Sequence, residues 1–245
     1  MSGSIYKAGS GAILQQMRLD VYANNLANVN TVGFKADQPV FRVENAEQPP
    51  QSSQNAPVLS PYALPMTCRT DFDAGALQNT GGQLDVAIEG NGFFEVQTPD
   101  GMQYTRNGRF SINEDGVLST PSGLPVMGQG GKITIEGNRV VIGEGGEVSV
   151  DGNVVGVLKV ADFKAPELLT KTEGTLFKAD NPAAGLGAAQ DYRLAQGTLE
   201  ASNVNAIRTM TDMIETLRVF ETYQKVIHAA DDATAKTVNE VGRSV

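Results

Sequence analysis

The chain has 245 residues, a formal net charge of −9 and a single cysteine, Cys68. Binding of nucleic acid needs clustered Lys and Arg, so the acidic balance and the scattered positive charges argue against that class of partner. One cysteine excludes an internal disulfide and a cysteine-based zinc site. No apolar run reaches the roughly 18 residues of a transmembrane helix, and polar residues interrupt the N-terminal segment before it could act as a cleavable signal.

Residues 4–29 carry the clearest periodicity of the chain. Apolar positions recur there at alternating steps of three and four, as in a heptad interrupted once by a glutamine, which predicts an amphipathic helix. The series is Ile5, Ala8, Ala12, Gln15, Leu19, Tyr22, Leu26 and Val29, widened by Leu14, Met17 and Val21. Gly9 and Gly11 each weaken such a helix by about 1 kcal/mol, so we expect it to fray without partners.

The predicted helix closes in a run of asparagines, Asn24, Asn25, Asn28 and Asn30. An amide side chain offers two donors and two acceptor lone pairs without charge, so the run predicts a junction whose amides join neighbouring backbones or subunits. Gly33 follows where a left-handed residue could end the helical region and turn Phe34 away from the helix axis. The simpler interpretation is that these asparagines are solvated helix-end residues.

Residues 36–80 predict an extended connector, because six of the 11 prolines lie between positions 39 and 65. One short strand is expected at its start, around Val40, Phe41 and Val43.

Residues 81–200 predict a β domain and its return connection. Strands at 93–97 and 103–106 flank the turn Pro99-Asp100-Gly101, and Asn107-Gly108 is a second hairpin signal. Further turns about every ten residues indicate an antiparallel meander or barrel, with one helical turn at 166–169.

Residues 201–245 predict a second long helix with Ser202 as its N-cap. Its three-four series is Ala206, Met210, Met213, Leu217, Phe220, Gln224, Ile227, Asp231, Thr234 and Val238. Matching heptads at both ends predict an α+β fold in which the N-terminal helix (1–35) and the C-terminal helix (201–245) pair antiparallel as a coiled-coil-like domain. The central antiparallel all-β domain lies between them in sequence. An ordinary helical hairpin that caps the β domain is the alternative.

The sequence shows no complete pattern of residues typical of a catalytic, metal-binding or phosphate-binding site. His228 has no second histidine or cysteine with which to share a metal, and Asp71 and Asp73 lack the remaining ligands of a calcium loop. The glycine-rich stretch 128–132 lacks the spacing of a phosphate loop. We therefore expect no catalytic, cofactor-binding or metal residue, and a protein that is not an enzyme.

Three stretches resemble one family. The run NNLANVNTVGFK at 24–35 looks like the N-terminal signature of bacterial flagellar axial proteins, the rod and hook subunits. Residues 84–94 resemble the opening of their β domain, and GTLEASNVN at 197–205 resembles the start of their C-terminal helix. The short length and compact middle look most like a proximal rod protein, with a distal rod protein as the second choice.

The resemblance implies a structural subunit of the basal-body rod, which polymerises through its terminal helices into the tubular drive shaft used for motility. It implies other rod subunits, copies of the chain itself and the flagellar type III export apparatus as partners. It also implies a location in the periplasm-spanning rod, after export without a cleaved signal peptide. The alternative function is a ligand-binding β module that the helices dimerise.

The expected assembly interface combines the helical faces with the motif residues. It comprises Leu19, Asn24, Asn25, Leu26, Asn28, Asn30, Gly33, Phe34, Asn203, Met213, Leu217 and Phe220.

Overall fold

The computed structural model describes residues 2–41 and 66–241. The chain divides into two compact units. The helical unit comprises Met1–Ala27, Asp37–Arg69 and Asn205–Val245, and the β unit comprises Asn28–Ala36 and Thr70–Val204. Each unit is described separately below.

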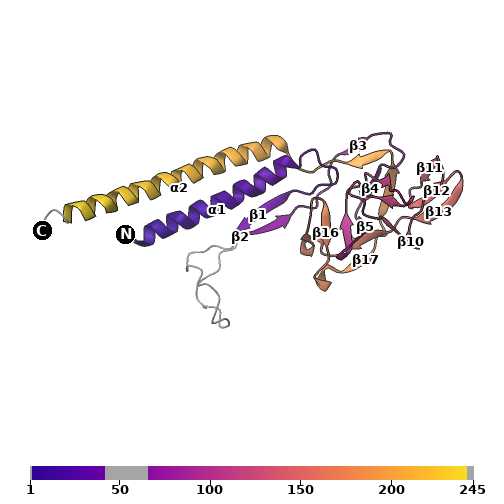
Figure 1. The fold of residues 1–245 in the computed structure, drawn as a ribbon, viewed down its shortest axis with the longest axis horizontal. Helices are drawn as coiled ribbons and strands as arrows, with labels where there is room; N and C mark the ends of the chain where they lie inside the picture. Colours follow the sequence, from indigo (N-terminus) through magenta and orange to yellow (C-terminus); the bar gives the residue numbers. More distant parts are fainter. Residues whose placement is uncertain (1, 42–65, 242–245) are drawn as a thin grey trace. The chain divides into compact units, whose positions relative to one another are not determined.

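Two long helices dominate the helical unit. Helix α1 spans Ser2–Ala27 and helix α2 spans Ala206–Val241, and they pack side by side in antiparallel directions (Figure 1). Strands β1 (Asp37–Phe41) and β2 (Met66–Thr70) form a two-stranded sheet, and β1 contacts α1. The short strand expected around Val40 is therefore confirmed as far as Phe41, whereas Val43 lies outside the described residues.

Helix α2 begins later than its sequence predicts. Asn205 is its N-terminal cap, because the Asn205 Oδ1 accepts a hydrogen bond from the Arg208 N–H at 3.0 Å. The Ser202 hydroxyl instead accepts from the Val204 N–H at 3.3 Å, within the turn that precedes the helix. The assignment of Ser202 as the cap was wrong because two polar residues with local acceptors compete there, and only the backbone path decides between them.

The face that α2 buries also differs from the predicted series. Thr216 is 2% exposed, whereas Met210 and Leu217 are 48% and 46% exposed. The reason lies on α1, where small residues let the helices approach closely: a Cβ at Gly11 would lie 2.6 Å from the ring of Tyr223. The buried seam of α2 therefore runs through Thr216 and Tyr223, and the apolar residues on one side of it remain uncovered.

The β unit is antiparallel throughout its paired strands. Its largest sheet has six strands in the order β15-β16-β6-β5-β14-β17, with β5 and β6 joined by the predicted hairpin. These strands are β5 Phe93–Thr98, β6 Gly101–Thr105, β14 Val160–Phe163, β15 Thr170–Lys171, β16 Leu176–Lys178 and β17 Leu186–Ala188.

Smaller sheets complete the unit. β11-β12-β13 form a three-stranded sheet, and β18 pairs with β4, β19 with β3, β7 with β8 and β9 with β10. Their bounds are β3 Leu77–Asn79, β4 Val86–Gly90, β7 Ser111–Ile112, β8 Leu118–Ser119, β9 Met127–Gly128, β10 Gly131–Lys132, β11 Val140–Ile142, β12 Glu147–Val150, β13 Asn153–Val157, β18 Tyr192–Gln196 and β19 Thr198–Glu200. Two 3-10 turns lie at Pro166–Leu168, as expected, and at Pro182–Ala184.

Two apolar clusters fill the β unit. Phe93 and Phe94 are adjacent on β5 and point to opposite faces of the sheet, so each belongs to a different cluster. Phe94 packs edge to face on Phe110, and Phe93 contacts Phe163 in the same geometry.

One predicted turn is absent. Asn107-Gly108 makes no hairpin, since β7 pairs with β8 rather than with β6. Gly108 instead accepts a hydrogen bond from the Val86 N–H at 2.9 Å, and a Cβ there would lie 1.6 Å from the Val86 carbonyl oxygen. Glycine is needed at position 108 because two backbone segments approach each other closely there. An Asn-Gly pair in a sequence is compatible with such an approach as well as with a turn.

Candidate functional site

Two asparagine side chains, those of Asn25 and Asn203, form hydrogen bonds to backbone groups of other segments. At the end of α1, the Asn25 amide donates to the Asp37 carbonyl at 2.7 Å and accepts from the Asp37 N–H at 2.9 Å. Asn25 is buried, so this two-bond contact ties the helix end to the first residue of β1 within the helical unit. The expectation that an amide of this run joins a neighbouring backbone holds at Asn25.

Asn203 makes the corresponding contact in the β unit. Its Oδ1 accepts from the Ala36 N–H at 2.8 Å, and its Nδ2 donates to the carbonyls of Asp71 and Asp73 at 2.9 and 3.1 Å. One side chain thereby links segment 33–36, which follows α1 in sequence, segment 71–73 and the segment that precedes α2. All three lie in the β unit.

Gly33 has the left-handed conformation that its place in the sequence predicts. Its φ is +67°, and its N–H donates to the Glu200 carbonyl at 2.8 Å. A Cβ at this position would lie 2.4 Å from the backbone carbon of Arg106. Glycine is required twice over, by the dihedral angle and by the close approach.

A buried ion cluster lies beside this turn. The Lys35 Nζ is 2.6 Å from the Glu200 Oε1, and the Arg106 guanidinium lies 3.4 Å from the Glu200 Oε2. Lys35 and Glu200 are each 1% exposed. The same carboxylate accepts the Gly75 N–H at 2.9 Å, while Lys35 also donates to the Asp73 carbonyl at 2.7 Å.

Arg106 completes the cluster through backbone oxygens. It donates to the carbonyls of Ile88 and Gly90 at 3.3 and 2.9 Å, and its guanidinium lies over the ring of Phe93. Burial lowers the pKa of both Lys35 and Arg106, against the opposing attraction of Glu200. The cluster therefore joins segment 33–36, segment 73–75, β4 and the end of β19 through one carboxylate.

Phe34 lies inside the β unit rather than on its surface. Its side chain is 1% exposed, the Lys171 Nζ lies 3.8 Å from its ring centroid, and the same ammonium donates to the Lys35 carbonyl at 2.7 Å. Gly33 does turn the chain, but it directs Phe34 into the chain's own core.

The expected interface residues fall into separate groups. Asn25, Gly33, Phe34 and Asn203 belong to the internal junctions above. Leu19, Leu26, Asn28, Met213 and Phe220 are half-buried, and Asn24, Asn30 and Leu217 are exposed. The Asn28 Oδ1 accepts from the Thr31 hydroxyl at 3.1 Å.

Sequence reasoning missed Lys35, Arg106 and Glu200. Two of them stand inside the quoted motifs, Lys35 at the end of NNLANVNTVGFK and Glu200 in GTLEASNVN. A single charged residue in an otherwise uncharged motif was the available signal. Pairing across 165 positions was not visible in one sequence.

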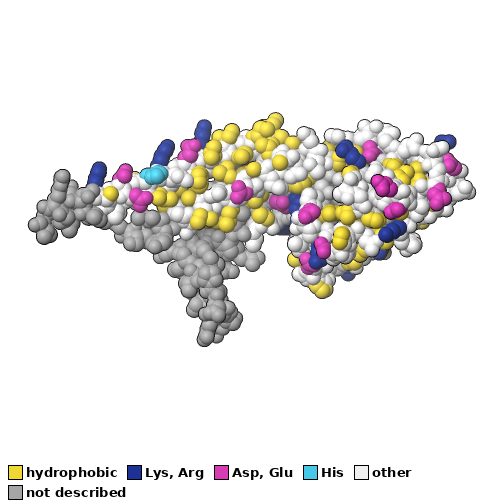
Figure 2. Space-filling view, in the orientation of Figure 1, with side chains coloured by type: hydrophobic (Ala, Val, Ile, Leu, Met, Phe, Trp, Pro, Cys, Tyr) yellow, Lys and Arg dark blue, Asp and Glu magenta, His cyan; other side chains and the backbone are white. Residues whose placement is uncertain are grey.

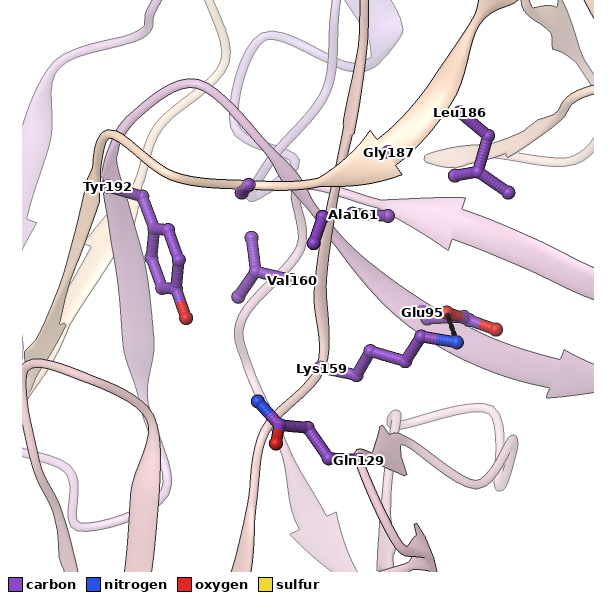
Figure 3. Close-up of a pocket in the computed structure, with 10 residues that line it drawn as sticks. Glu95, Gln129, Lys159, Val160, Ala161, Leu186, Gly187 and Tyr192 are labelled. Carbon is purple, nitrogen blue, oxygen red and sulfur yellow. Dashed lines mark ion pairs between the residues drawn. The ribbon is translucent and has the colours of Figure 1, made fainter.

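One pocket of about 290 Å³ lies at the edge of the six-stranded sheet, beside β14 and β17 (Figure 3). Its charged side chains, Glu95 and Lys159, already form an ion pair at 2.8 Å, and Tyr192 and Leu186 line its ends. Among the described residues no group of three or more metal-ligating side chains occurs. No helix in the described ranges is long and apolar enough to cross a membrane.

Comparison with known proteins gives one consistent family. Residues 5–35 match the family described as flagella basal body rod protein, residues 87–150 match the flagellar hook protein FlgE/F/G D1 domain, and residues 195–240 match the flagellar basal body rod FlgEFG protein C-terminal region.

The similar proteins align with nearly the whole chain. It is 32% identical over 246 residues to the flagellar basal-body rod protein FlgF of Caulobacter vibrioides, with 99% of each chain covered. It is 34% identical to the rod protein FlgG of Buchnera aphidicola, with 96% of this chain and 98% of the relative covered. For FlgG of Bacillus subtilis the identity is 32%, over 98% and 99%. The paired terminal helices, the antiparallel β unit and these matches agree: the chain belongs to the flagellar basal-body rod protein family, whose members are structural and not enzymes.

Proposed function

We propose that this chain is a rod subunit that polymerises through its two terminal helices into the tubular shaft of the flagellum. The observation that carries the proposal is an apolar stripe on α2 that α1 does not cover. It consists of Ile207, Met210, Ile214 and Leu217, which are 80%, 48%, 54% and 46% exposed. Figure 2 shows hydrophobic side chains gathered over the N-terminal half of α2.

The stripe has the spacing of an interface. Its four residues follow one another at steps of three, four and three, so they lie on one side of the helix over about 15 Å. Scattered apolar residues on a surface are ordinary, whereas a continuous apolar row at helical spacing is typical of a surface that another helix covers. The α2 helix thus has one apolar face for α1 and a second one for a partner.

Leu217→Asp tests this proposal in cells. Because Leu217 is half exposed and lies off the seam with α1, the substitution should leave the fold of the chain unchanged and place a charge in the contact between subunits. Burying that charge costs several kcal/mol. We expect the variant to be made normally and to be recovered from isolated basal bodies at least about tenfold less than wild type.

Val226→Asp is the matched control. Val226 is 49% exposed, also on α2, but it faces away from the stripe. Normal recovery of Leu217→Asp, or equal losses for the two variants, would contradict assembly through the stripe. Phe220→Asp is a poorer probe, because Phe220 is half-buried in the helical unit and its loss would also weaken the helix pair.

Within the rod, we propose the proximal position. The short length and compact middle support it, as does the alignment with the FlgF relative, which covers 99% of both chains over 246 residues. Alignments with two FlgG relatives extend over 256 and 266 residues. Imaging of labelled chain in basal bodies at a position beyond the inner part of the rod would contradict this assignment.

We also propose export through the flagellar type III apparatus without cleavage. The support is the interrupted apolar character of the N-terminal segment, which does not fit a cleavable signal. The expected result is that the chain recovered from basal bodies begins at the same residue as the chain inside the cell, and that its recovery depends on the export apparatus. A shortened N-terminus would contradict the proposal.

A further inference from the structure

The outer face of α1 has an unusual composition for a helix surface in water. Between Ala8 and Ala27 the exposed residues are Ile13, Gln16, Met17, Asp20, Ala23, Asn24 and Ala27. Asp20 is the one charged side chain among them. The exposed positions of α2 carry charges of both signs along the helix, from Arg208 to Lys236. A solvated helix face is normally rich in charge, so the outer face of α1 has the composition of a surface that is covered.

Two apolar side chains mark the centre of this face. Ile13 and Met17 are 57% and 44% exposed and stand one helical turn apart. Asp20 lies on the same side, three residues after Met17. On α2, Arg218 lies four residues after Ile214 at the side of the apolar stripe. The two surfaces are thus both apolar at their centres. The margin of the stripe carries both signs, because exposed Glu221 follows Leu217 by four residues, and Arg218 is a group there that complements Asp20.

The symmetry of a rod decides which surface the stripe meets. If the α2 stripes of two copies met each other, the contact would be isologous and would close at two chains. A rod grows only through a contact between two different surfaces. Among the described residues of the helical unit, Ile13 and Met17 form the other exposed apolar pair with one-turn spacing, whereas Val219 and Val226 are two turns apart.

We infer that the outer face of α1, centred on Ile13 and Met17, is the docking surface for the α2 stripe of a second copy of this chain. The inference rests on the proposed function and adds the partner surface to it. The contact is head-to-tail: each chain offers its α1 face to one neighbour and its α2 stripe to another.

Disulfide cross-linking between different copies tests the pairing directly. In a Cys68→Ser background, one chain carries Met17→Cys and a second, co-expressed chain carries Ile214→Cys, so that any disulfide joins two copies. We expect a disulfide-linked dimer from oxidised basal bodies of the mixed strain and none from strains with either cysteine alone. Dimers from Ile214→Cys alone would show an isologous contact and overturn the inference. Basal bodies that contain both chains without a mixed dimer would overturn it as well.

A charge substitution gives an independent measurement. Met17→Asp should lower recovery of the chain in basal bodies at least about tenfold, with Val226→Asp as the control. If Leu217→Asp blocks incorporation and Met17→Asp does not, the α1 surface is wrong and assembly through the α2 stripe stands. If neither substitution matters, the proposed function itself fails.

Discussion

Glu200 is the residue on which separate segments of the β unit converge. Its carboxylate meets Lys35, Arg106 and the Gly75 N–H, and its carbonyl accepts the Gly33 N–H. Two buried cations thus depend on one anion. Buried charges are tolerated only when they are paired. Removing one member of the cluster therefore leaves the remaining charges buried without a counter-charge, which destabilises the folded state.

Glu200→Gln should therefore be among the most damaging single changes in the β unit. The amide keeps the size of the side chain but leaves Lys35 and Arg106 without their counter-charge, for an expected loss of about 3–5 kcal/mol in the free energy of unfolding. Chemical denaturation of the purified chain measures it. Exposed Glu89→Gln is the control, and a loss below about 1 kcal/mol at Glu200 would show that the cluster is not the main tie between these segments.

The pKa of Lys35 gives a pH signature. Burial lowers this pKa below its ordinary 10.5, so in the window between the two values the unfolded chain holds a proton that the folded chain has released. The free energy of unfolding then rises with pH through that window. We expect the difference in unfolding free energy, wild type minus Lys35→Met, to increase as pH approaches 10.5 from below. A flat or falling difference would mean that attraction to Glu200 outweighs burial.

Gly33→Val should be worse than an ordinary loop substitution. A β-branched residue at φ +67° is strained by about 1–3 kcal/mol, and its Cβ would also collide with the Arg106 backbone. Thermal unfolding should show a clear loss of stability. Gly123→Val separates the two causes, because Gly123 has a φ of +81° with nothing within 4 Å of a Cβ. Equal losses at both positions would mean that the dihedral angle alone matters.

At the scale of elements, the helices and strands draw their stability from different sources. The β unit has two apolar clusters and a buried ion cluster of its own. The helical unit relies on a narrow seam in which small residues of α1 meet Thr216 and Tyr223 of α2, and it leaves apolar surface open. A helix pair with a narrow seam and interior glycines is marginal until partners cover it.

Limited proteolysis of the purified monomer should reveal this difference. We expect cleavage within residues 1–30 and 202–245 first, leaving a β-rich fragment that includes residues 70–201 and resists longer. Circular dichroism should show helix content below that of the described structure and a gain on assembly. Protection of both terminal segments in a verified monomer would contradict the expectation.

At the scale of the whole molecule, the parts of this chain correspond to the segments by which the family is defined. Members of the flagellar basal-body rod family share the terminal segments and the β domain that match residues 5–35, 195–240 and 87–150 of this chain. In this chain the β unit includes residues 28–36, which directly follow α1, and β19, the last strand before α2. The helices offer the surfaces proposed for assembly. A change at Leu217 should therefore reduce incorporation into the rod without lowering the stability of the subunit. A change at Glu200 should lower the stability of the folded subunit itself.

The sequence by itself determined the periodic features. Alternating three-four spacing located both helices, the Pro99-Asp100-Gly101 turn located the β5–β6 hairpin, and the position of Gly33 indicated its left-handed backbone. These features depend on neighbours within a few residues, which one sequence displays. The α+β class followed from their order along the chain.

Only the tertiary structure decided which side of each helix is covered and which charges are paired. Leu217 and Thr216 are adjacent in sequence, yet the small residues of α1 put Thr216 in the seam and leave Leu217 outside. Lys35 and Glu200 stand 165 positions apart and read as ordinary solvated charges until the fold buries both. Contacts between distant segments depend on how two surfaces fit, and no local spacing in the chain encodes that fit.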